Sequence, residues 1–234
     1  MIPLKDTLPT RGFPVVNTIL IVLNCVVFLF QFATAQHSAE IVEQWGMVPL
    51  RIVGGHDPLR LLTVLTSMFM HGGWMHLIGN MWFLYIFGDN VEDALGKARY
   101  VFFYLLCGLA GAAGQIAVDP WSKVPMIGAS GAIAGILGGY LSLYPRARVL
   151  TLVPIFIFLQ VMTLPAIVFI VLWFALQALE GIGSLGQAGG GTAWWAHIGG
   201  FLLGLAMIRL LVPARRTLPD PRQIGAPPRR RIEW

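Results

Sequence analysis

The sequence predicts an all-α membrane protein, a polytopic bundle of six transmembrane helices. Of the 234 residues, 56% are hydrophobic and only 12% are charged, whereas a soluble globular domain carries about 25% charged residues. Six uncharged intervals are each long enough to hold the roughly 20 apolar residues of a spanning helix. These intervals are residues 12–39, 61–88, 100–118, 124–145, 149–179 and 181–208. The pattern excludes a cytosolic enzyme, a disordered chain and a DNA-binding domain.

The distribution of cations predicts the orientation. With six spans, both termini and the second and fourth loops share one side, and that side carries 13 of the 16 Lys and Arg residues. Only Arg51, Arg60 and Lys123 fall on the other side. Cytoplasmic loops carry the Lys and Arg excess in membrane proteins, so we expect both termini in the cytoplasm.

The chain divides into three parts. Residues 1–13 are expected to be a cytoplasmic N-terminus, residues 14–212 a six-helix domain, and residues 213–234 a basic cytoplasmic tail. Because the tail is rich in Pro and Arg, we expect it to be disordered and to contact anionic lipid; no nucleic-acid partner is expected. Cys25 and Cys107 lie in apolar segments and are interpreted as small core residues.

The hydropathy and the breaking residues predict the helix boundaries. The expected helices are residues 15–33, 74–87, 98–118, 128–143, 164–179 and 194–211. Residues 34–62 form a first outer loop too apolar for water and too broken to span, so we expect it to lie at the membrane interface. Pro154 and Pro165 break the fifth interval, so an interfacial stretch is expected before its helix. A Gly-rich outer loop, residues 181–191, precedes the last helix.

Polar residues inside membrane helices are functional candidates, because they are costly to bury there. Three short patterns contain them. The patterns are His71-Gly-Gly-Trp-Met-His76-Leu-Ile-Gly-Asn80, Gly128-Ala-Ser130-Gly131 and Ala196-His197-Ile-Gly-Gly200-Phe-Leu-Leu-Gly204. Each pattern begins or precedes a helix that runs from the outer side inwards, so all three are expected at the outer end of the bundle.

Three of these side chains are expected at one depth. His76, Ser130 and His197 lie within about the first two turns of their helices, roughly 10 Å. The small-residue stripes Ser130, Ala134, Gly138 and His197, Gly200, Gly204 would allow two helices to pack closely. Such packing could bring the Ser130 hydroxyl within hydrogen-bond reach of the His197 imidazole. The alternative is that Ser130 serves only helix packing.

A paired serine and histidine suit nucleophilic catalysis, because the imidazole can take the hydroxyl proton and return it to a leaving amine. The six apolar intervals contain no Asp or Glu, which favours a Ser130–His197 dyad over a triad and argues against an aspartyl protease. No His-Glu-x-x-His pattern of a zinc protease is present. A three-histidine metal site of His71, His76 and His197 is an alternative, but we expect neither a metal nor a cofactor.

An acyl-transfer site also needs donors for an oxyanion. Ser130 is expected in the first turn of its helix, where backbone N–H groups and the helix dipole favour negative charge. His76 and Asn80 are spaced i, i+4 on one face and offer imidazole and carboxamide donors. A structural clasp between His76 and Asn80 is the alternative. His71, one residue before two glycines, is expected to be a loop residue or to support His76.

Together these three patterns, in this order, resemble the rhomboid intramembrane serine proteases of the bacterial, six-helix type, over roughly residues 60–204. The resemblance implies Ser130 as nucleophile, His197 as general base, and His76 and Asn80 with the Ser130 backbone N–H as the oxyanion hole. Gly128, Gly131, Gly200 and Gly204 would then be packing residues around the dyad.

The resemblance also implies a water-filled cavity that opens outward, a membrane-embedded first loop, and a fifth helix that moves for substrate entry. The implied partners are transmembrane protein substrates cleaved near their outer ends and membrane lipids, and the implied location is a bacterial inner membrane. Ala134, four residues after Ser130, departs from members that carry there an aromatic stacked on the catalytic histidine.

Two other classes remain open from the sequence. A non-catalytic rhomboid-like membrane chaperone or sorting factor would keep the fold without using Ser130. A small transporter would need a polar pathway through the inner leaflet, and the sequence offers none.

Overall fold

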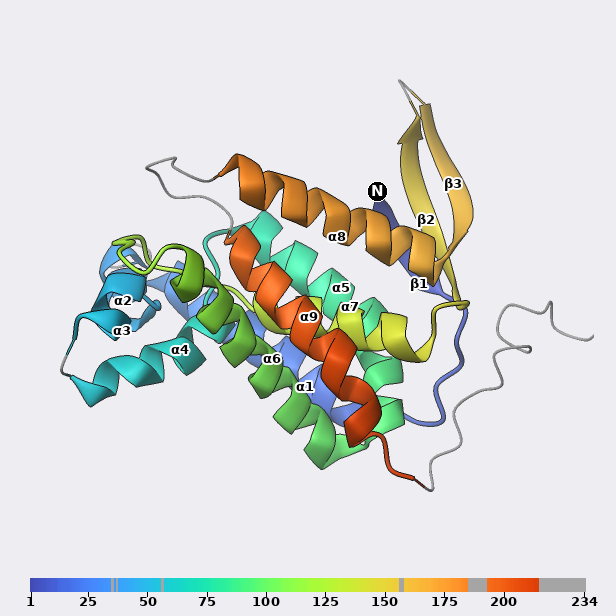
Figure 1. Ribbon diagram of the computed structural model, residues 1–234, viewed down its shortest axis with the longest axis horizontal. Helices are drawn as coiled ribbons and strands as arrows, with labels where there is room; N and C mark the ends of the chain where they lie inside the picture. The colour runs from blue at the N-terminus through green and yellow to red at the C-terminus, as the bar shows by residue number, and fades with distance from the viewer. Residues whose placement is uncertain (35, 37, 56, 156–157, 185–192, 215–234) are drawn as a thin grey trace, which may run out of the picture.

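The computed structural model describes residues 1–34, 36, 38–55, 57–155, 158–184 and 193–214. Four helices in these ranges are long and apolar enough to cross a membrane. They are α1 (Val15–Ala33), α6 (Lys97–Val118), α8 (Ala166–Gly183) and α9 (Trp194–Leu211). The predicted all-α, multi-pass fold is confirmed (Figure 1). The basic tail beyond residue 214 and residues 185–192 of the Gly-rich loop lie outside the described residues.

The other two predicted helices differ from simple spans. Residues Pro58–Phe69 and α5 (Trp74–Leu95) pass the same test only when they are taken together, and they are bent by 80° relative to each other. The fourth predicted helix, α7 (Ser130–Leu143), has 14 residues, about 21 Å at 1.5 Å per residue. Eleven of its residues are buried, so this short helix is surrounded by protein and does not need to match the thickness of the lipid bilayer.

Helix α5 extends two turns beyond the predicted residue 87. The charged residues beyond the predicted end of the helix have partners there. The Glu92 carboxylate accepts hydrogen bonds from the backbone N–H groups of Val16 (3.1 Å) and Asn17 (2.7 Å), and Asp93 pairs with Arg11. These N–H groups lie in the first turn of α1, where no intrahelical partner exists. Glu92 therefore caps α1 and ties it to α5. Gly96, at φ +79°, then ends α5 and begins the turn into α6.

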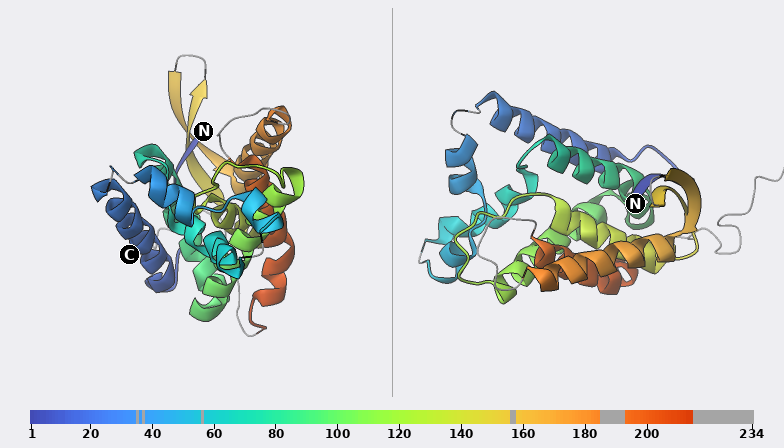
Figure 2. Two further views of the ribbon diagram at one scale, coloured as in Figure 1. Left: turned by 90° about the vertical axis from the view of Figure 1, so that its left-hand side faces the viewer. Right: turned by 90° about the horizontal axis from the view of Figure 1, so that it is seen from above.

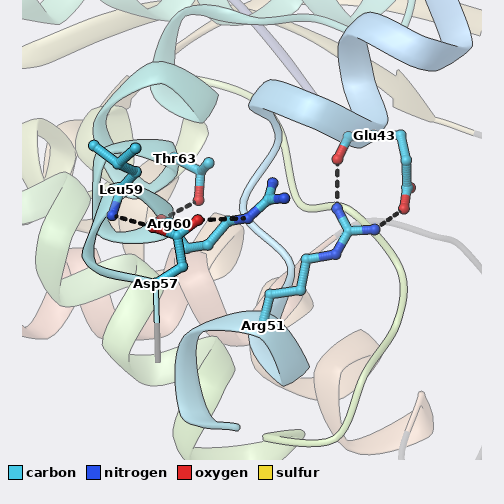
Figure 3. A network of polar contacts seen from close by, with 6 residues as sticks. All are labelled: Glu43, Arg51, Asp57, Leu59, Arg60 and Thr63. Carbon is cyan, nitrogen blue, oxygen red and sulfur yellow. Dashed lines mark hydrogen bonds and ion pairs between the residues drawn. The ribbon is translucent and has the colours of Figure 1, made fainter. Parts of the chain in front are cut away.

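Short helices connect α1 to α5. They are α2 (Ser38–Trp45), α3 (Pro49–Val53), the 3₁₀ helix η2 (Pro58–Leu61), α4 (Leu62–Thr66) and the 3₁₀ helix η3 (Ser67–Phe69). Polar contacts brace this connection (Figure 3): Arg51 pairs with Glu43, Arg60 lies 3.7 Å from Asp57, and Asp57 also accepts from the Leu59 backbone N–H.

A three-stranded antiparallel sheet lies at the opposite end of the bundle from this connection (Figures 1 and 2). Its order is β1 (Ile2–Asp6), β2 (Arg148–Ile155), β3 (Phe158–Pro165). The sequence predicts an interfacial stretch where β2 and β3 lie, and it predicts no strand at the N-terminus. Val149, Thr151 and Val153 alternate as β-branched residues, which favours a strand. Pairing with β1 reaches only Leu152, so Pro154 lies beyond it, where a missing N–H is tolerated.

Helices α7 and α9 pack with their backbones in contact, and glycines make this possible. A Cβ at Gly200 would collide with the Gly131 carbonyl oxygen, and a Cβ at Gly204 with that of Gly135. The stripe predicted on α9 therefore faces α7 as expected. On α7, Gly131 and Gly135 lie against this stripe, one residue after the predicted Ser130 and Ala134. Gly138 of the predicted stripe also meets the α9 backbone, at Phe201, and the Ser130 side chain bonds to His197 on α9.

Candidate active site

Ser130 and His197 lie at the same end of the bundle and are hydrogen bonded. Ser130 is the first residue of α7 and His197 the fourth of α9, and 2.8 Å separates Ser130 Oγ from His197 Nε2. His197 is buried. The close packing of α7 against α9 holds the two side chains at this distance, because Gly131, the residue after Ser130, meets Gly200, one turn after His197.

Gly128 brings His76 close to the same hydroxyl. Gly128 has φ +125°, and its backbone N–H donates to the Ser67 carbonyl (2.8 Å). A Cβ at this position would lie 2.7 Å from His76 Nε2 and 3.7 Å from Ser130 Oγ. Only glycine fits both this backbone conformation and this contact. The His76 imidazole edge therefore lies beside the turn that precedes Ser130.

Asn80 lies one turn below His76 on α5, and both residues line the same cavity. The Asn80 Nδ2 group donates to the backbone carbonyl of His76 (2.9 Å). This bond is within one helix, so it is not a clasp between helices, and it uses only one of the two N–H groups of the carboxamide.

His71 lies behind His76 and does not line the cavity. Its ring is buried and contacts the His76 ring edge-on, with 5.1 Å between ring centroids. Its backbone N–H donates to the Gln31 side chain on α1 (3.1 Å). Within the described part of the chain, no three His, Cys, Asp or Glu side chains come close enough to hold a metal ion.

A cavity of about 1250 Å³ opens over these residues. Its lining includes Ser130, His197, His76 and Asn80, and Gly128 and Gly131 form part of the wall. The cavity combines a paired hydroxyl and imidazole with nearby N–H donors at the start of a helix. Such an arrangement can activate a serine for attack on a carbonyl group and stabilise the charge that develops.

Two side chains from α8 complete the surroundings of His197, and neither is among the site residues predicted from the sequence. Gln177 Oε1 lies 2.5 Å from His197 Nδ1, and the Trp173 ring stacks on the imidazole with 6.1 Å between centroids. Trp173 supplies from α8 an aromatic contact that Ala134 cannot make. A signal was present, because Gln177 is a polar residue within the uncharged interval 149–179 and lies i+4 from Trp173.

Comparison with known proteins agrees with this geometry. The family model described as Rhomboid domain matches residues 58–214, more than half of the chain. YdcA of Bacillus subtilis, a protein named as a rhomboid protease, is 33% identical over 131 residues. The match covers 56% of this chain and 63% of YdcA.

Two further relatives match in the same way. RHOMBOID-like protein 4 of Arabidopsis thaliana is 30% identical over 187 residues, covering 79% of this chain and 42% of that protein. Rhomboid protease GluP of Bacillus subtilis is 30% identical over 132 residues, covering 56% of this chain and 25% of GluP. The match is therefore shorter than two thirds of each of these three relatives. The helical bundle and the domain match together show that this chain is a multi-pass integral membrane protein of the rhomboid family, a family of intramembrane proteases.

Proposed function

We propose that this protein is an intramembrane serine endopeptidase that uses Ser130 and His197 as a catalytic dyad. The observation that supports this most directly is the 2.8 Å hydrogen bond between Ser130 Oγ and His197 Nε2 at the wall of a large cavity. Family membership supports the same reaction class.

The reaction proceeds in two halves. His197 Nε2 takes the Ser130 proton as Oγ attacks the scissile carbonyl carbon, and a tetrahedral oxyanion forms. The C–N bond then breaks, the imidazolium gives its proton to the leaving amine, and an acyl-enzyme remains. Water from the cavity attacks this ester with His197 again as base, and the carboxylic product leaves Ser130 free.

The oxyanion is stabilised by groups at the start of α7 and on α5. The Ser130 backbone N–H lies in the first turn of α7, where the helix dipole favours negative charge. His76 and the second N–H of Asn80 are the side-chain donors, since both residues line the cavity. His71, packed on His76, supports the orientation of that ring.

The substrates are transmembrane proteins, cut within about two turns of their outer boundary. A helical peptide bond already has its carbonyl hydrogen bonded, so the substrate must unwind before attack. The wall that Gly128 and Gly131 form beside Ser130 suits a small residue at the cleaved position. The excess of Lys and Arg residues on the side of the two termini supports a cytoplasmic location for both. The membrane of this proposal is a bacterial inner membrane.

The proposal is tested by labelling Ser130. A fluorophosphonate should modify the purified full chain in detergent at Ser130, located by mass spectrometry, and Ser130→Ala and His197→Ala should abolish both labelling and cleavage of a transmembrane substrate. Ser142→Ala is the matched control, because Ser142 lies at the far end of α7, bonded to Arg209. Cleavage by Ser130→Ala would contradict the dyad. A folded wild-type chain that neither labels nor cleaves would favour the non-catalytic chaperone or sorting factor.

The oxyanion role of Asn80 is tested by its own substitution. Losing one oxyanion donor costs about 10²–10³ in rate, so Asn80→Ala should lower cleavage by that factor. Thermal stability in detergent should change little, because the bond that is lost lies within α5. A variant that unfolds, with its folded fraction fully active, would make Asn80 structural.

A further inference from the structure

Helix α8 contributes a buried polar group to the catalytic histidine. Only five of the 18 residues of α8 are buried, and Gln177 is the one polar side chain among them. Its Oε1 atom lies 2.5 Å from Nδ1 of His197, on the side of the ring opposite the nitrogen that bonds to Ser130. The three side chains therefore form one continuous chain of hydrogen bonds, Gln177–His197–Ser130.

With the Gln177 amide oriented as in the structure, its oxygen toward Nδ1, the protons of these hydrogen bonds have one assignment. An amide oxygen can only accept a hydrogen bond, so the contact with Gln177 requires the proton on Nδ1. In a neutral imidazole the other nitrogen is then unprotonated. Nε2 is left as an acceptor for the Ser130 hydroxyl, which is the tautomer that a general base needs.

Trp173 restricts the ring in a second direction. It precedes Gln177 by four residues, so both side chains lie on one face of α8. Its indole stacks on the imidazole at an interplanar angle of 30°. The hydrogen bond fixes the rotation of the ring in its plane, and the stacking fixes the plane.

We propose that Gln177 is a positioning residue, which holds His197 in the tautomer and orientation that activate Ser130. This inference rests on the proposed protease function and adds a member to its site. Unlike the aspartate of a Ser-His-Asp triad, Gln177 carries no charge, so it orients the imidazole without adding electrostatic stabilisation of the imidazolium. Because the group comes from α8, the base is competent only while α8 is in contact with α9.

The simplest competing role for Gln177 is structural, a polar link between α8 and α9. The two roles differ in what substitution changes. A structural link affects folding and leaves the tautomer of His197 unchanged, whereas a positioning residue affects the tautomer and the rate in a protein that remains folded.

The rate experiment uses fluorophosphonate labelling of Ser130 in the full chain, which needs no identified substrate. Gln177→Leu removes the acceptor and should slow labelling by about 10- to 100-fold, by analogy with the loss of a hydrogen-bond partner that orients a metal-binding histidine. Gln177→Glu keeps an acceptor oxygen and should restore most of the rate. Its pH–rate profile should shift its acid limb to higher pH, because a carboxylate stabilises the imidazolium. Gln160→Leu, the same change on the exposed strand β3, should label like the wild type.

The tautomer is measured by nitrogen-15 NMR of imidazole-labelled chain, with His197 assigned by loss of its signals in His197→Ala. The wild type and Gln177→Glu should show a protonated Nδ1, and Gln177→Leu should show the Nε2-protonated form gaining population. An Nε2–H tautomer in the wild type would overturn the proposal, whether or not the leucine variant folds.

The two proposals fail in different ways. If wild-type Ser130 is not labelled, the protease function fails and this inference fails with it. If Ser130 is labelled and a folded Gln177→Leu variant reacts at the wild-type rate, only the positioning role is wrong.

Discussion

Helices α7 and α8 are held in the bundle in different ways. α7 buries 11 of its 14 residues, and its glycines meet the backbone of α9. α8 buries 5 of 18 residues and exposes an apolar face suited to lipid. Leu176, Leu179 and Ile182 on that face are each at least half exposed. Figure 1 shows α8 along the outside of the bundle, beside α9.

This difference divides the candidate site. The two atoms that would exchange the catalytic proton are on α7 and α9, whose separation is fixed by backbone contact. The groups that orient the base are on α8, whose contacts are side chains at a bundle surface. The distance between Ser130 and His197 is therefore set by rigid packing, whereas the orientation of the imidazole depends on a helix with few buried residues.

The largest effect is expected for a glycine-to-alanine substitution where α9 packs on α7, and the same substitution on α8 should have little effect. Gly204→Ala places a methyl group against the backbone of Gly135, which cannot move without displacing α7. Overpacking of this kind costs about 1–3 kcal/mol or more, so thermal unfolding in detergent should occur at a clearly lower temperature.

Gly183→Ala is the matched change on α8, where a Cβ would meet nothing within 4 Å. Its unfolding free energy should stay within about 0.5 kcal/mol of the wild type, as for an exposed site. Equal destabilisation by the two variants would show that α7–α9 packing is no tighter than the attachment of α8.

The same contrast explains how much the sequence could predict. The six helices, the Ser130–His197 pairing and the shared depth of His76 followed from uncharged intervals and from spacing along single helices. Gly200 and Gly204 were found as a stripe because small-residue spacing is itself the signal for close packing.

Other features depended on contacts between distant segments. The pairing of β1 with β2 joins residues almost 150 positions apart, and no local pattern in residues 2–6 indicates a partner. Gln177 was not predicted as a partner of His197, because only Asp and Glu were considered as acceptors and Gln177 is uncharged. Its role depends on the rotation of α8 about its axis, which the nearly uniform apolar sequence of that helix leaves open.

A smaller effect should follow from loss of the stacked aromatic. Trp173→Ala removes the ring that stacks on His197, and an aromatic contact of this kind is worth about 0.5–1.5 kcal/mol. Fluorophosphonate labelling of Ser130 should therefore slow by about two- to tenfold, and Trp173→Phe should restore most of the rate. Trp121→Ala, on an exposed part of the loop before α7, serves as the control. A Trp173→Ala variant that labels at the wild-type rate would show that His197 is oriented without the stacking contact, by the hydrogen bond to Gln177 alone.

The most local effect concerns the sheet that anchors the start of α8. The Ala166 backbone N–H donates to the Ala147 carbonyl beside β2, so α8 begins on the sheet. Strand β1 is tied to α7 by Asp6, whose carboxylate accepts a hydrogen bond from the Tyr140 hydroxyl (2.6 Å). Burial raises the pKa of the Asp6 carboxyl from 3.8 to about 7, the nearby charge of Asp89 adds to this, and the Tyr140 hydrogen bond and Lys5 oppose it.

The raised pKa predicts how the docking of β1 depends on pH. Asp6 released into water ionises above its ordinary pKa of 3.8, whereas docked Asp6 stays neutral until about pH 7. The docked strand thus binds more protons, so its stability is greatest below about pH 4 and falls as the pH rises to about 7. Hydrogen exchange of residues 2–6, expressed as protection relative to the intrinsic rate at each pH, should show this decline, and Asp6→Asn should remove it. If α8 is anchored through the sheet, its first turn should lose protection over the same range while α7 does not. A parallel loss in α7 would mean that the two helices respond as one unit, contrary to the difference in packing described above.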